Sequence, residues 1–188
     1  MLLLLVSLSC LAAVKAQLRC CTASQWSATM VDAQTMANGN NVSSDIFYDD
    51  VNSTIAIRYY EFGNKQRVSL NTVVTAYSKK VRYNISPDGH CTKENITDIM
   101  VHNCIPETAI YRGSSFVGDQ WAMLRTSGWH FPIGSLNITI SVTDYDCVPV
   151  FMGVVGISSS SPINMLLYFN GHKAGITDPT AFDVPSNC

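Results

Sequence analysis

The chain of 188 residues contains few charged side chains. Asp, Glu, Lys and Arg make up 14% of the sequence, and 12 basic residues stand against 14 acidic ones, for a formal net charge of −2. A protein held to nucleic acid by phosphate contacts needs a strongly basic surface, so the composition argues against that class. Disorder is excluded too, because 47% of the residues are hydrophobic and can bury enough surface to offset the entropy of ordering.

Catalytic motifs are also lacking. The sequence has no G-x-S-x-G turn, no H-E-x-x-H helix and no phosphate-binding loop, and glutamate occurs only at positions 61, 94 and 107. A Ser-His-Asp triad is assembled by geometry rather than by spacing, so a secreted hydrolase remains a distant alternative. We therefore predict a protein that is not an enzyme and needs no organic cofactor.

No apolar run is long enough to span a membrane. Residues 2–14 are almost entirely apolar, but a spanning helix needs about 20 residues. The run lies at the N-terminus, and Val14 and Ala16 supply the small residues that flank Lys15 at a cleavage site. We predict a signal peptide over residues 1–16, followed by one domain over residues 17–188 of a secreted, extracellular protein.

Cysteine, in contrast, is abundant. Cleavage of the leader removes Cys10 and leaves Cys20, Cys21, Cys91, Cys104, Cys147 and Cys188. In an oxidising compartment all of these can pair, although their spacing alone does not choose among the pairings. Neighbouring Cys20 and Cys21 rarely bond to each other and are expected to hold two different places. A zinc site at His90–Cys91 and His102–Cys104 is less favoured, because the tight C-x2-C spacing is missing.

Five N-x-S/T sequons support secretion. They predict N-linked glycans on Asn41, Asn52, Asn84, Asn95 and Asn137. Asn84 and Asn137 fall on the polar positions of alternating segments, so we expect both side chains to face outward. The sequons and the cysteines together predict a glycoprotein.

Apolar and polar residues alternate through most of the chain, which predicts strands. The clearest apolar positions are Ile55, Ile57, Tyr59, Val81, Tyr83, Ile85, Leu136, Ile138, Ile140 and Val142. Further strands are expected over residues 25–32, 45–48, 67–77, 119–126, 149–157 and 163–170. Turn residues at 38–40, 62–64, 87–89, 127–128 and 158–162 separate the strands. We predict one all-β domain with a largely antiparallel sheet, barrel-like or sandwich, and short helical turns only at 97–103 and 178–182.

Two acidic pairs are candidates for holding a hard cation. Asp49 with Asp50, and Asp144 with Asp146, place carboxylates near strand ends, and calcium prefers such oxygen ligands. Isolated acidic pairs are more often solvated turn residues. Basic and aromatic residues also interleave over residues 58–83, which suggests either a solvent-facing surface or a weak contact with anionic lipids.

The large apolar residues raise one more alternative. A sheet that curls without closing has a concave face that can hold a lipid or another hydrophobic ligand. Periodicity alone does not distinguish the wall of such a pocket from an ordinary core.

Three segments resemble motifs of one family. Cys20-Cys-Thr-Ala-Ser-Gln-Trp26 resembles the opening C-x-A-P-x-x-W of ependymin-related proteins, and Asp144-Tyr-Asp-Cys147-Val-Pro-Val150 resembles their D-C-x-P-V strand. The end of the chain, Gly175-Ile-Thr-Asp-Pro179-Thr-Ala-Phe182-Asp-Val-Pro185-Ser-Asn-Cys188, resembles their G-I-x-D-P-x-x-F-x-P-P-x-x-C terminus. The chain departs from the family at Ala23, where proline is expected, and at Ser27 and Ala28, which replace Glu-Gly.

The resemblance implies a deeply curved antiparallel sheet that forms a half-open β-barrel, similar to bacterial lipoprotein-carrier folds. It also implies a homodimer with a hydrophobic pocket, an association with calcium and partners in the extracellular matrix. The implied disulfides join Cys20 to Cys147, Cys91 to Cys188 and Cys21 to Cys104, with Cys20 and Cys21 able to exchange roles.

Two hypotheses follow. The first is a carrier without catalysis that binds a lipid or fatty acid on the concave face. Its expected inward residues are Ile55, Ile57, Tyr59, Val81, Tyr83, Ile85, Leu136, Ile138, Ile140 and Val142, with Trp121 at the mouth. A strand with the opposite alternation phase would lose its residues from this set. The second is a calcium-dependent matrix or adhesion glycoprotein that acts through its glycans and a dimer surface.

Overall fold

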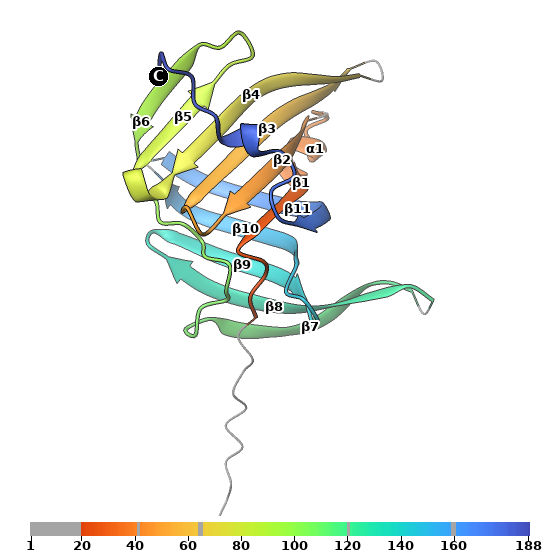
Figure 1. Cartoon of the computed structure of the whole chain (residues 1–188). Helices are drawn as coiled ribbons and strands as arrows, with labels where there is room; N and C mark the ends of the chain where they lie inside the picture. Colours follow the sequence, from red (N-terminus) through yellow and green to blue (C-terminus); the bar gives the residue numbers. More distant parts are fainter. Residues whose placement is uncertain (1–19, 41, 64–65, 120, 159–160) are drawn as a thin grey trace, which may run out of the picture.

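The fold is known from a computed structural model, which describes residues 20–40, 42–63, 66–119, 121–158 and 161–188. The predicted signal peptide and the sequon residue Asn41 lie outside these ranges. The described residues form one antiparallel sheet of 11 strands (Figure 1). The strands are β1 (Gln25–Asp32), β2 (Val42–Asp49), β3 (Thr54–Gly63), β4 (Gln66–Ala76), β5 (Val81–Ile85), β6 (Cys91–Asn95), β7 (Ile110–Gly118), β8 (Met123–Ile133), β9 (Leu136–Thr143), β10 (Pro149–Ser158) and β11 (Ser161–Ala174).

In the part of the chain that is described, helix is confined to three short pieces. They are α1 (Ala33–Ala37) and the 3-10 turns η1 (Tyr77–Lys79) and η2 (Pro179–Phe182). The expected turn at 178–182 is present as η2, whereas no helix forms at 97–103. In the part of the chain that the structure describes, no helix is long and apolar enough to cross a membrane.

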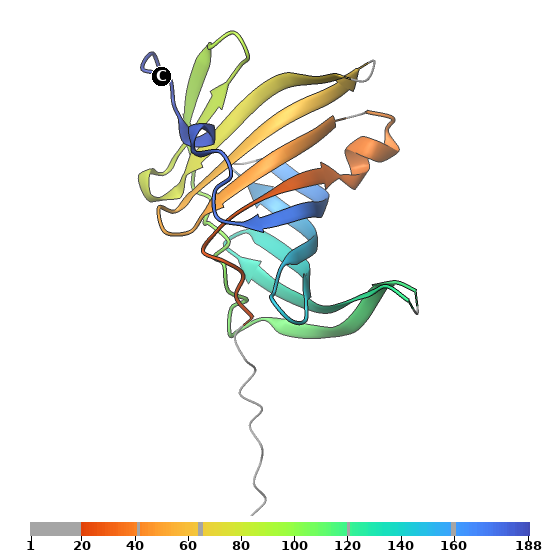
Figure 2. The ribbon, with the colours of Figure 1, turned by 45° about the vertical axis from the view of Figure 1, so that its right-hand side comes forward.

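The sheet consists of two meanders that meet at its centre: the first comprises β1 to β6 and the second comprises β7 to β11. Its strand order is β6-β5-β4-β3-β2-β1-β11-β10-β9-β8-β7, so neighbours within each half are consecutive in sequence. The first and last strands then pair, with Met30 opposite Phe169. The sheet curves strongly but stays open, with β6 and β7 as its edges (Figures 1 and 2). The predicted all-β, half-open antiparallel fold is confirmed.

Several predicted boundaries differ from those observed. Residues 25–32 form β1 as expected, but residues 127–128, predicted as a turn, lie inside β8. Strands β6 and β7 were not predicted. Nearly all of their residues are exposed, and a strand that is exposed on both faces has no apolar alternation to reveal it.

Apolar residues cover both faces of the sheet. On the inner, concave face, one buried cluster gathers around Trp26, Ile46 and Leu167, and a second gathers around Phe131 and Ile138. A third cluster lies on the outer face, where Phe47, Ala56 and Val74 meet the C-terminal segment. Figure 2 shows this segment, in dark blue, crossing the strands of the first meander. The first meander is therefore sandwiched between two apolar layers.

A long connection joins the two edges of the sheet. Residues 96–109, here called the edge connection, link β6 to β7 along one side of the curved sheet (Figure 1). Its residues Ile96 and Met100 are buried, and Met100 packs in the cluster around Trp26. The edge connection therefore forms part of the inner core.

Three disulfides hold the ends of the chain to the sheet. They join Cys20 to Cys147, Cys21 to Cys104 and Cys91 to Cys188. These are the three pairs that the family resemblance implies. The first two fix the N-terminal segment to both the second meander and the edge connection. The third fixes the C-terminus to the edge strand β6.

Candidate functional site

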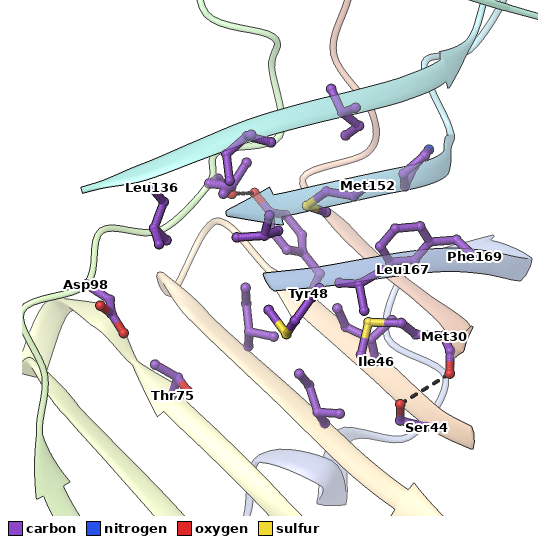
Figure 3. Close-up of a pocket in the computed structure, with 18 of the residues that line it drawn as sticks. Met30, Ser44, Ile46, Tyr48, Thr75, Asp98, Leu136, Met152, Leu167 and Phe169 are labelled. Carbon is purple, nitrogen blue, oxygen red and sulfur yellow. Dashed lines mark hydrogen bonds between the residues drawn. The ribbon is translucent and has the colours of Figure 1, made fainter. Parts of the chain in front are cut away.

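A cavity of about 560 Å³ lies on the inner face of the curved sheet. Its wall draws residues from strands β1 to β6, from strands β8 to β11 and from the edge connection. Figure 3 shows side chains from opposite sides of the fold converging on this space, among them Ile46, Met152 and Leu167. Most of these side chains are apolar, so the cavity is suited to an apolar ligand.

Aromatic residues and methionines join the more numerous aliphatic side chains in the wall of the cavity. The rings of Trp26 and Tyr48 stack with centroids 5.1 Å apart, and Phe169 meets Trp26 edge-on at 6.0 Å. Met30, Met152 and Met165 add flexible thioether side chains to the wall. Methionine adapts its shape to its surroundings, so this wall can accommodate ligands of different contours.

Seven of the residues expected to face inward do line the cavity. They are Ile55, Ile57, Tyr59, Leu136, Ile138, Ile140 and Val142. They come from β3 and β9, the two strands on which the alternation is longest and clearest. Their role in binding stays a prediction.

The expected inward orientation of Val81, Tyr83 and Ile85 is wrong. The other face of β5 lines the cavity, through Arg82 and Asn84, while Tyr83 and Ile85 pack in the outer cluster beside the C-terminal segment. Because this segment covers the outer face of β5, apolar residues are buried there as well. The sequon residue Asn84, expected to face outward, consequently lies on the cavity side.

Trp121 does not lie at the mouth of the cavity. It follows β7 in the turn before β8, its side chain is 86% exposed, and it is absent from the cavity wall. The hairpin formed by β7 and β8 extends beyond the rest of the sheet (Figures 1 and 2), which carries this turn away from the cavity.

One end of the cavity is polar and centres on Arg82. Its Nη2 donates to Oδ2 of Asp98 at 2.8 Å, and its Nη1 donates to Oε1 of Glu94 at 3.1 Å. The hydroxyl of Ser158 also donates to Oδ2 of Asp98, at 2.6 Å. Asp98 therefore ties the edge connection to β5 and to β10.

Two tyrosines line the cavity near this cluster. Burial raises the pKa of Tyr77, an effect that the Arg82 charge opposes and the Asp98 charge reinforces. Burial likewise raises the pKa of Tyr59, again opposed by Arg82. Both hydroxyls therefore stay protonated at neutral pH and can donate or accept hydrogen bonds.

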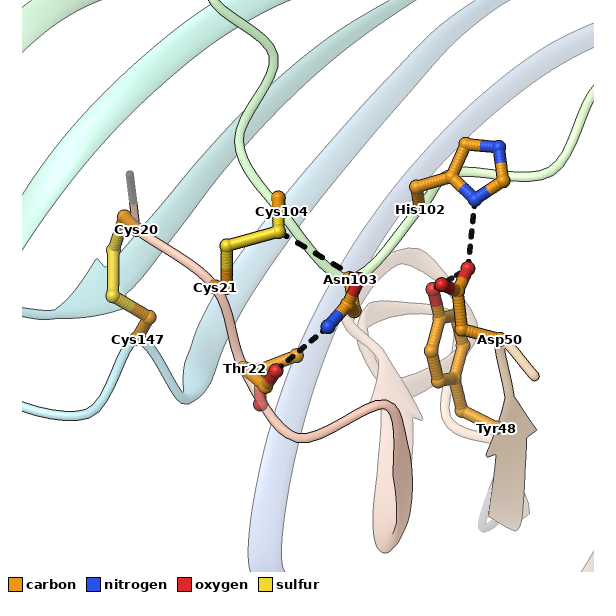
Figure 4. The surroundings of a disulfide bond; sticks show 9 residues. All are labelled: Cys20, Cys21, Thr22, Tyr48, Asp50, His102, Asn103, Cys104 and Cys147. Atoms are coloured by element: carbon orange, nitrogen blue, oxygen red, sulfur yellow. Dashed lines mark hydrogen bonds and ion pairs between the residues drawn. A yellow bond between two sulfur atoms is a disulfide. The ribbon is translucent and has the colours of Figure 1, made fainter. Parts of the chain in front are cut away.

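Near the other end, the edge connection is fastened to the N-terminal segment (Figure 4). Beside the Cys21–Cys104 disulfide, Nδ2 of Asn103 donates to the carbonyl oxygen of Thr22 at 2.9 Å. Nδ1 of His102 lies 2.7 Å from Oδ1 of Asp50. This arrangement holds one wall of the cavity in place.

The acidic pairs do not converge on one point. Burial alone would raise the pKa of Asp49, but hydrogen bonds from Asn52, Gln25 and Val51 together outweigh it and hold the pKa below its ordinary value. Asp50 instead faces His102, while Ser127 donates to Asp144 and Thr143 donates to Asp146. Within the described ranges, no group of three or more His, Cys, Asp or Glu residues is placed to hold a metal ion. Calcium binding stays a prediction.

The remaining described sequon residues lie on the surface. Asn52 is exposed in the turn between β2 and β3, Asn95 ends β6, and Asn137 is exposed on β9. Asn137 therefore has the outward orientation expected from its alternating segment, in contrast to Asn84.

Sequence reasoning missed the residues that the edge connection brings to the site. Asp98, Val101 and His102 line the cavity from a segment without periodicity or a recognisable motif. The methionines of the wall were also missed, although Met152 lies in a segment predicted as a buried strand. Arg82 was weakly indicated by the sequence: it alternates with Val81 and Tyr83, so it had to lie on the opposite face of the strand from these two residues.

Known proteins resemble this chain in sequence and in fold. The family model described as Ependymin matches residues 64–188. Ependymin-related protein 1 of Haliotis asinina is 28% identical over 155 residues, covering 76% of each chain. The solved structure of an uncharacterized conserved protein from Thermus thermophilus has a TM-score of 0.51 at 11% identity, covering 88% of each chain, and shares the fold alone. Because the family model spans most of the chain, this protein belongs to the ependymin family.

Proposed function

We propose that the protein is a secreted, N-glycosylated carrier that binds a hydrophobic ligand of the lipid class on the concave face of its sheet. The observation that carries the proposal is the apolar cavity of about 560 Å³, whose wall combines residues from both meanders. A cavity of this size falls in the range of sites for small ligands, roughly 300–1,000 Å³. The carrier acts by binding and needs no catalytic group.

The covalent features support an extracellular setting. Three disulfides join residues 83 to 127 positions apart, and disulfides of this kind persist in oxidising compartments. The sequon residues Asn52, Asn95 and Asn137 are exposed, as acceptors of N-linked glycans must be. Enzymatic removal of N-glycans from the secreted protein should lower its mass; an unchanged mass would argue against glycosylation.

Native mass spectrometry of the protein secreted by its own source tests the carrier proposal. We expect an additional mass that corresponds to a bound lipid and that disappears after denaturation. A neutral apolar dye should also fluoresce in the ligand-free protein. If no lipid co-purifies and no apolar probe binds, the carrier proposal fails.

A substitution that fills part of the cavity tests whether the dye binds there. Met152, on β10, packs against both inner clusters, so Met152→Trp should occupy part of the cavity and weaken dye binding at least about tenfold. Val155 lies on the same strand but is 53% exposed on the opposite face. The control Val155→Trp should bind the dye as the wild type does. Equal affinities of the two variants would place the dye outside the cavity.

A second proposal concerns self-association. We propose that the hairpin of β7 and β8, here called the arm, forms a homodimer surface. Strand β7 pairs with β8 alone among the described strands, and its edge carries unpaired backbone groups. The arm exposes Ile110, Tyr111, Phe116, Val117, Met123 and Leu124. Apolar side chains gathered on one element often mark an interaction surface.

Analytical ultracentrifugation of a single variant tests this surface. Phe116 is 63% exposed, so Phe116→Glu should shift the protein toward monomer without unfolding it. Val155→Glu, on the outer face of β10, is the control and should leave the association unchanged. A wild-type protein that is monomeric at all concentrations would contradict the proposal.

A further inference from the structure

The polar end of the cavity contains more negative than positive charge. Arg82 is the cation of this cluster, and it pairs with both Asp98 and Glu94. One guanidinium thus stands against two carboxylates, which leaves the cluster with a net negative charge. Asp32, the other carboxylate among the described residues of the wall, adds to the negative potential. The remaining basic residue of the wall, His102, lies against Asp50.

Asp98 presents a free acceptor at this end. Its side chain is only 10% exposed, and both of its hydrogen bonds, from Arg82 and Ser158, reach the same oxygen, Oδ2. Its second oxygen, Oδ1, has no hydrogen-bond partner among the described residues. Figure 3 shows the carboxylate directed from the edge connection toward Thr75. Oδ1 is not one of the buried side-chain oxygens left without a partner in the described part of the chain, so water or a ligand donor can reach it from the cavity.

Hydroxyl groups surround the free acceptor. Thr75 lines the cavity directly beside Arg82 in the register of β4 and β5. Tyr59 and Tyr77 add two more hydroxyls to the cavity wall. Each of these oxygens can accept a hydrogen bond. The polar end therefore offers one anionic and several neutral acceptors.

The class of ligand is inferred by matching the charge and the hydrogen-bond donors of its head group to the negative charge and the acceptors at the polar end. An ammonium group carries one positive charge and three N–H donors and has no acceptor, whereas a carboxylate carries acceptors only. A fatty acid head would become the third carboxylate around Arg82. On the basis of the carrier function proposed above, we propose that the cavity takes a long-chain amphiphile with a primary ammonium head. In this arrangement the ammonium lies between Asp98 and Thr75, and the alkyl chain lies among Met152, Leu167 and Phe169.

Three amphiphiles with the same alkyl chain test the proposal. Dodecylamine, dodecanol and dodecanoate would each displace Nile red, a neutral apolar dye, from the ligand-free protein at neutral pH. We expect the amine to bind about tenfold or more tightly than the acid, with the alcohol between them. An acid or an alcohol that binds as tightly as the amine overturns the headgroup inference but leaves the carrier function standing. If none of the three displaces the dye and no lipid co-purifies, the carrier function fails and this inference fails with it.

Two variants test whether the preference for the amine over the acid depends on the carboxylates at the polar end of the cavity. Asp98→Asn should bring the amine and acid affinities to within a few-fold of each other, because it removes the charge at the free acceptor. Asp98 also fastens the edge connection, so a second variant is needed that leaves this contact intact. Glu94 has a side chain that is 47% exposed, and Glu94→Gln should reduce the ratio of amine affinity to acid affinity by a smaller factor than Asp98→Asn does. Glu61→Gln, on the exposed surface of β3, is the matched control and should leave the ratio unchanged. An unaltered amine-to-acid ratio in both cavity variants overturns the proposal.

Discussion

The hydroxyl of Tyr48 on β2 donates a hydrogen bond of 2.9 Å to the carbonyl oxygen of Val101, 53 residues further along the chain. Oδ1 of Asp50 lies 3.1 Å from the same hydroxyl as a second acceptor. The ring of Tyr48 meanwhile stacks on Trp26. One side chain thus connects the first meander, the inner core and the edge connection.

Tyr48→Phe should loosen the edge connection while keeping the ring stack. We expect the free energy of unfolding in urea to fall by about 1 kcal/mol, the usual net contribution of one hydrogen bond. Hydrogen exchange should quicken at the amide of Ile105, which donates to the carbonyl of Cys20. Tyr145 is 99% exposed, so Tyr145→Phe should change neither measurement. Equal stability of the two variants would contradict the role given to the Tyr48 hydroxyl.

Alkaline pH should destabilise the protein through its buried tyrosines. Burial raises the pKa of Tyr48, Tyr59 and Tyr77 above the ordinary value of about 10. Below pH about 10 these hydroxyls are protonated in both states, so their contribution to stability is fully present. Above it, the unfolded chain loses protons that the folded chain keeps, so the free energy of unfolding falls as the pH rises.

Ultraviolet absorbance of tyrosinate measures this effect. Tyr48, Tyr59 and Tyr77 should ionise only as the chain unfolds, so their tyrosinate signal should rise together with the loss of the fold. For Tyr48 the expected loss is up to about 1.4 kcal/mol per pH unit. A titration in which all eight tyrosines ionise together near pH 10, with the fold intact, would contradict their burial.

Replacement of Cys91 and Cys188 by serine should loosen the C-terminal segment. The disulfide spans 97 residues, for which the chain-entropy estimate is about 4–5 kcal/mol and measured values are often lower. The segment would still be held by the ion pair of Arg58 with Asp178 and by the burial of Ala181. We therefore expect faster proteolysis after residue 175 and a lower unfolding midpoint. An unchanged midpoint would show that the disulfide contributes little.

Gly156→Ala should strain the pairing of β9 with β10. Gly156 has a φ of +151°, and an added Cβ would lie 2.2 Å from the carbonyl oxygen of Ser135. We expect a loss of at least about 2 kcal/mol in the free energy of unfolding. Gly171 has a φ of +62° with open space around it, so Gly171→Ala should cost only about 1 kcal/mol. If both variants lose the same free energy of unfolding, the backbone around Gly156 shifts to accommodate the added Cβ, and the expected strain is absent.

Much of the architecture could be predicted from the sequence because the apolar alternation is strong on the central strands. Leu136, Ile138 and Ile140 on β9 line the cavity as their period indicated, and the boundaries of β1 agree with the predicted strand over residues 25–32. The C-terminal motif indicated the family and its disulfide pairing. These features are local or come from motifs, so they do not depend on distant contacts.

The tertiary structure alone decided which side of β5 faces the cavity. Alternation shows that the two faces of a strand differ, but it identifies the inner face only where the outer one meets water. On β5 the C-terminal segment covers the outer face, so Tyr83 and Ile85 are partly buried there and Arg82 is left for the cavity. The edge connection then brings Asp98 to Arg82 from 16 residues away. The scarcity of charge was visible in the sequence, but the gathering of charge at one end of an apolar cavity depends on contacts that only the folded chain makes.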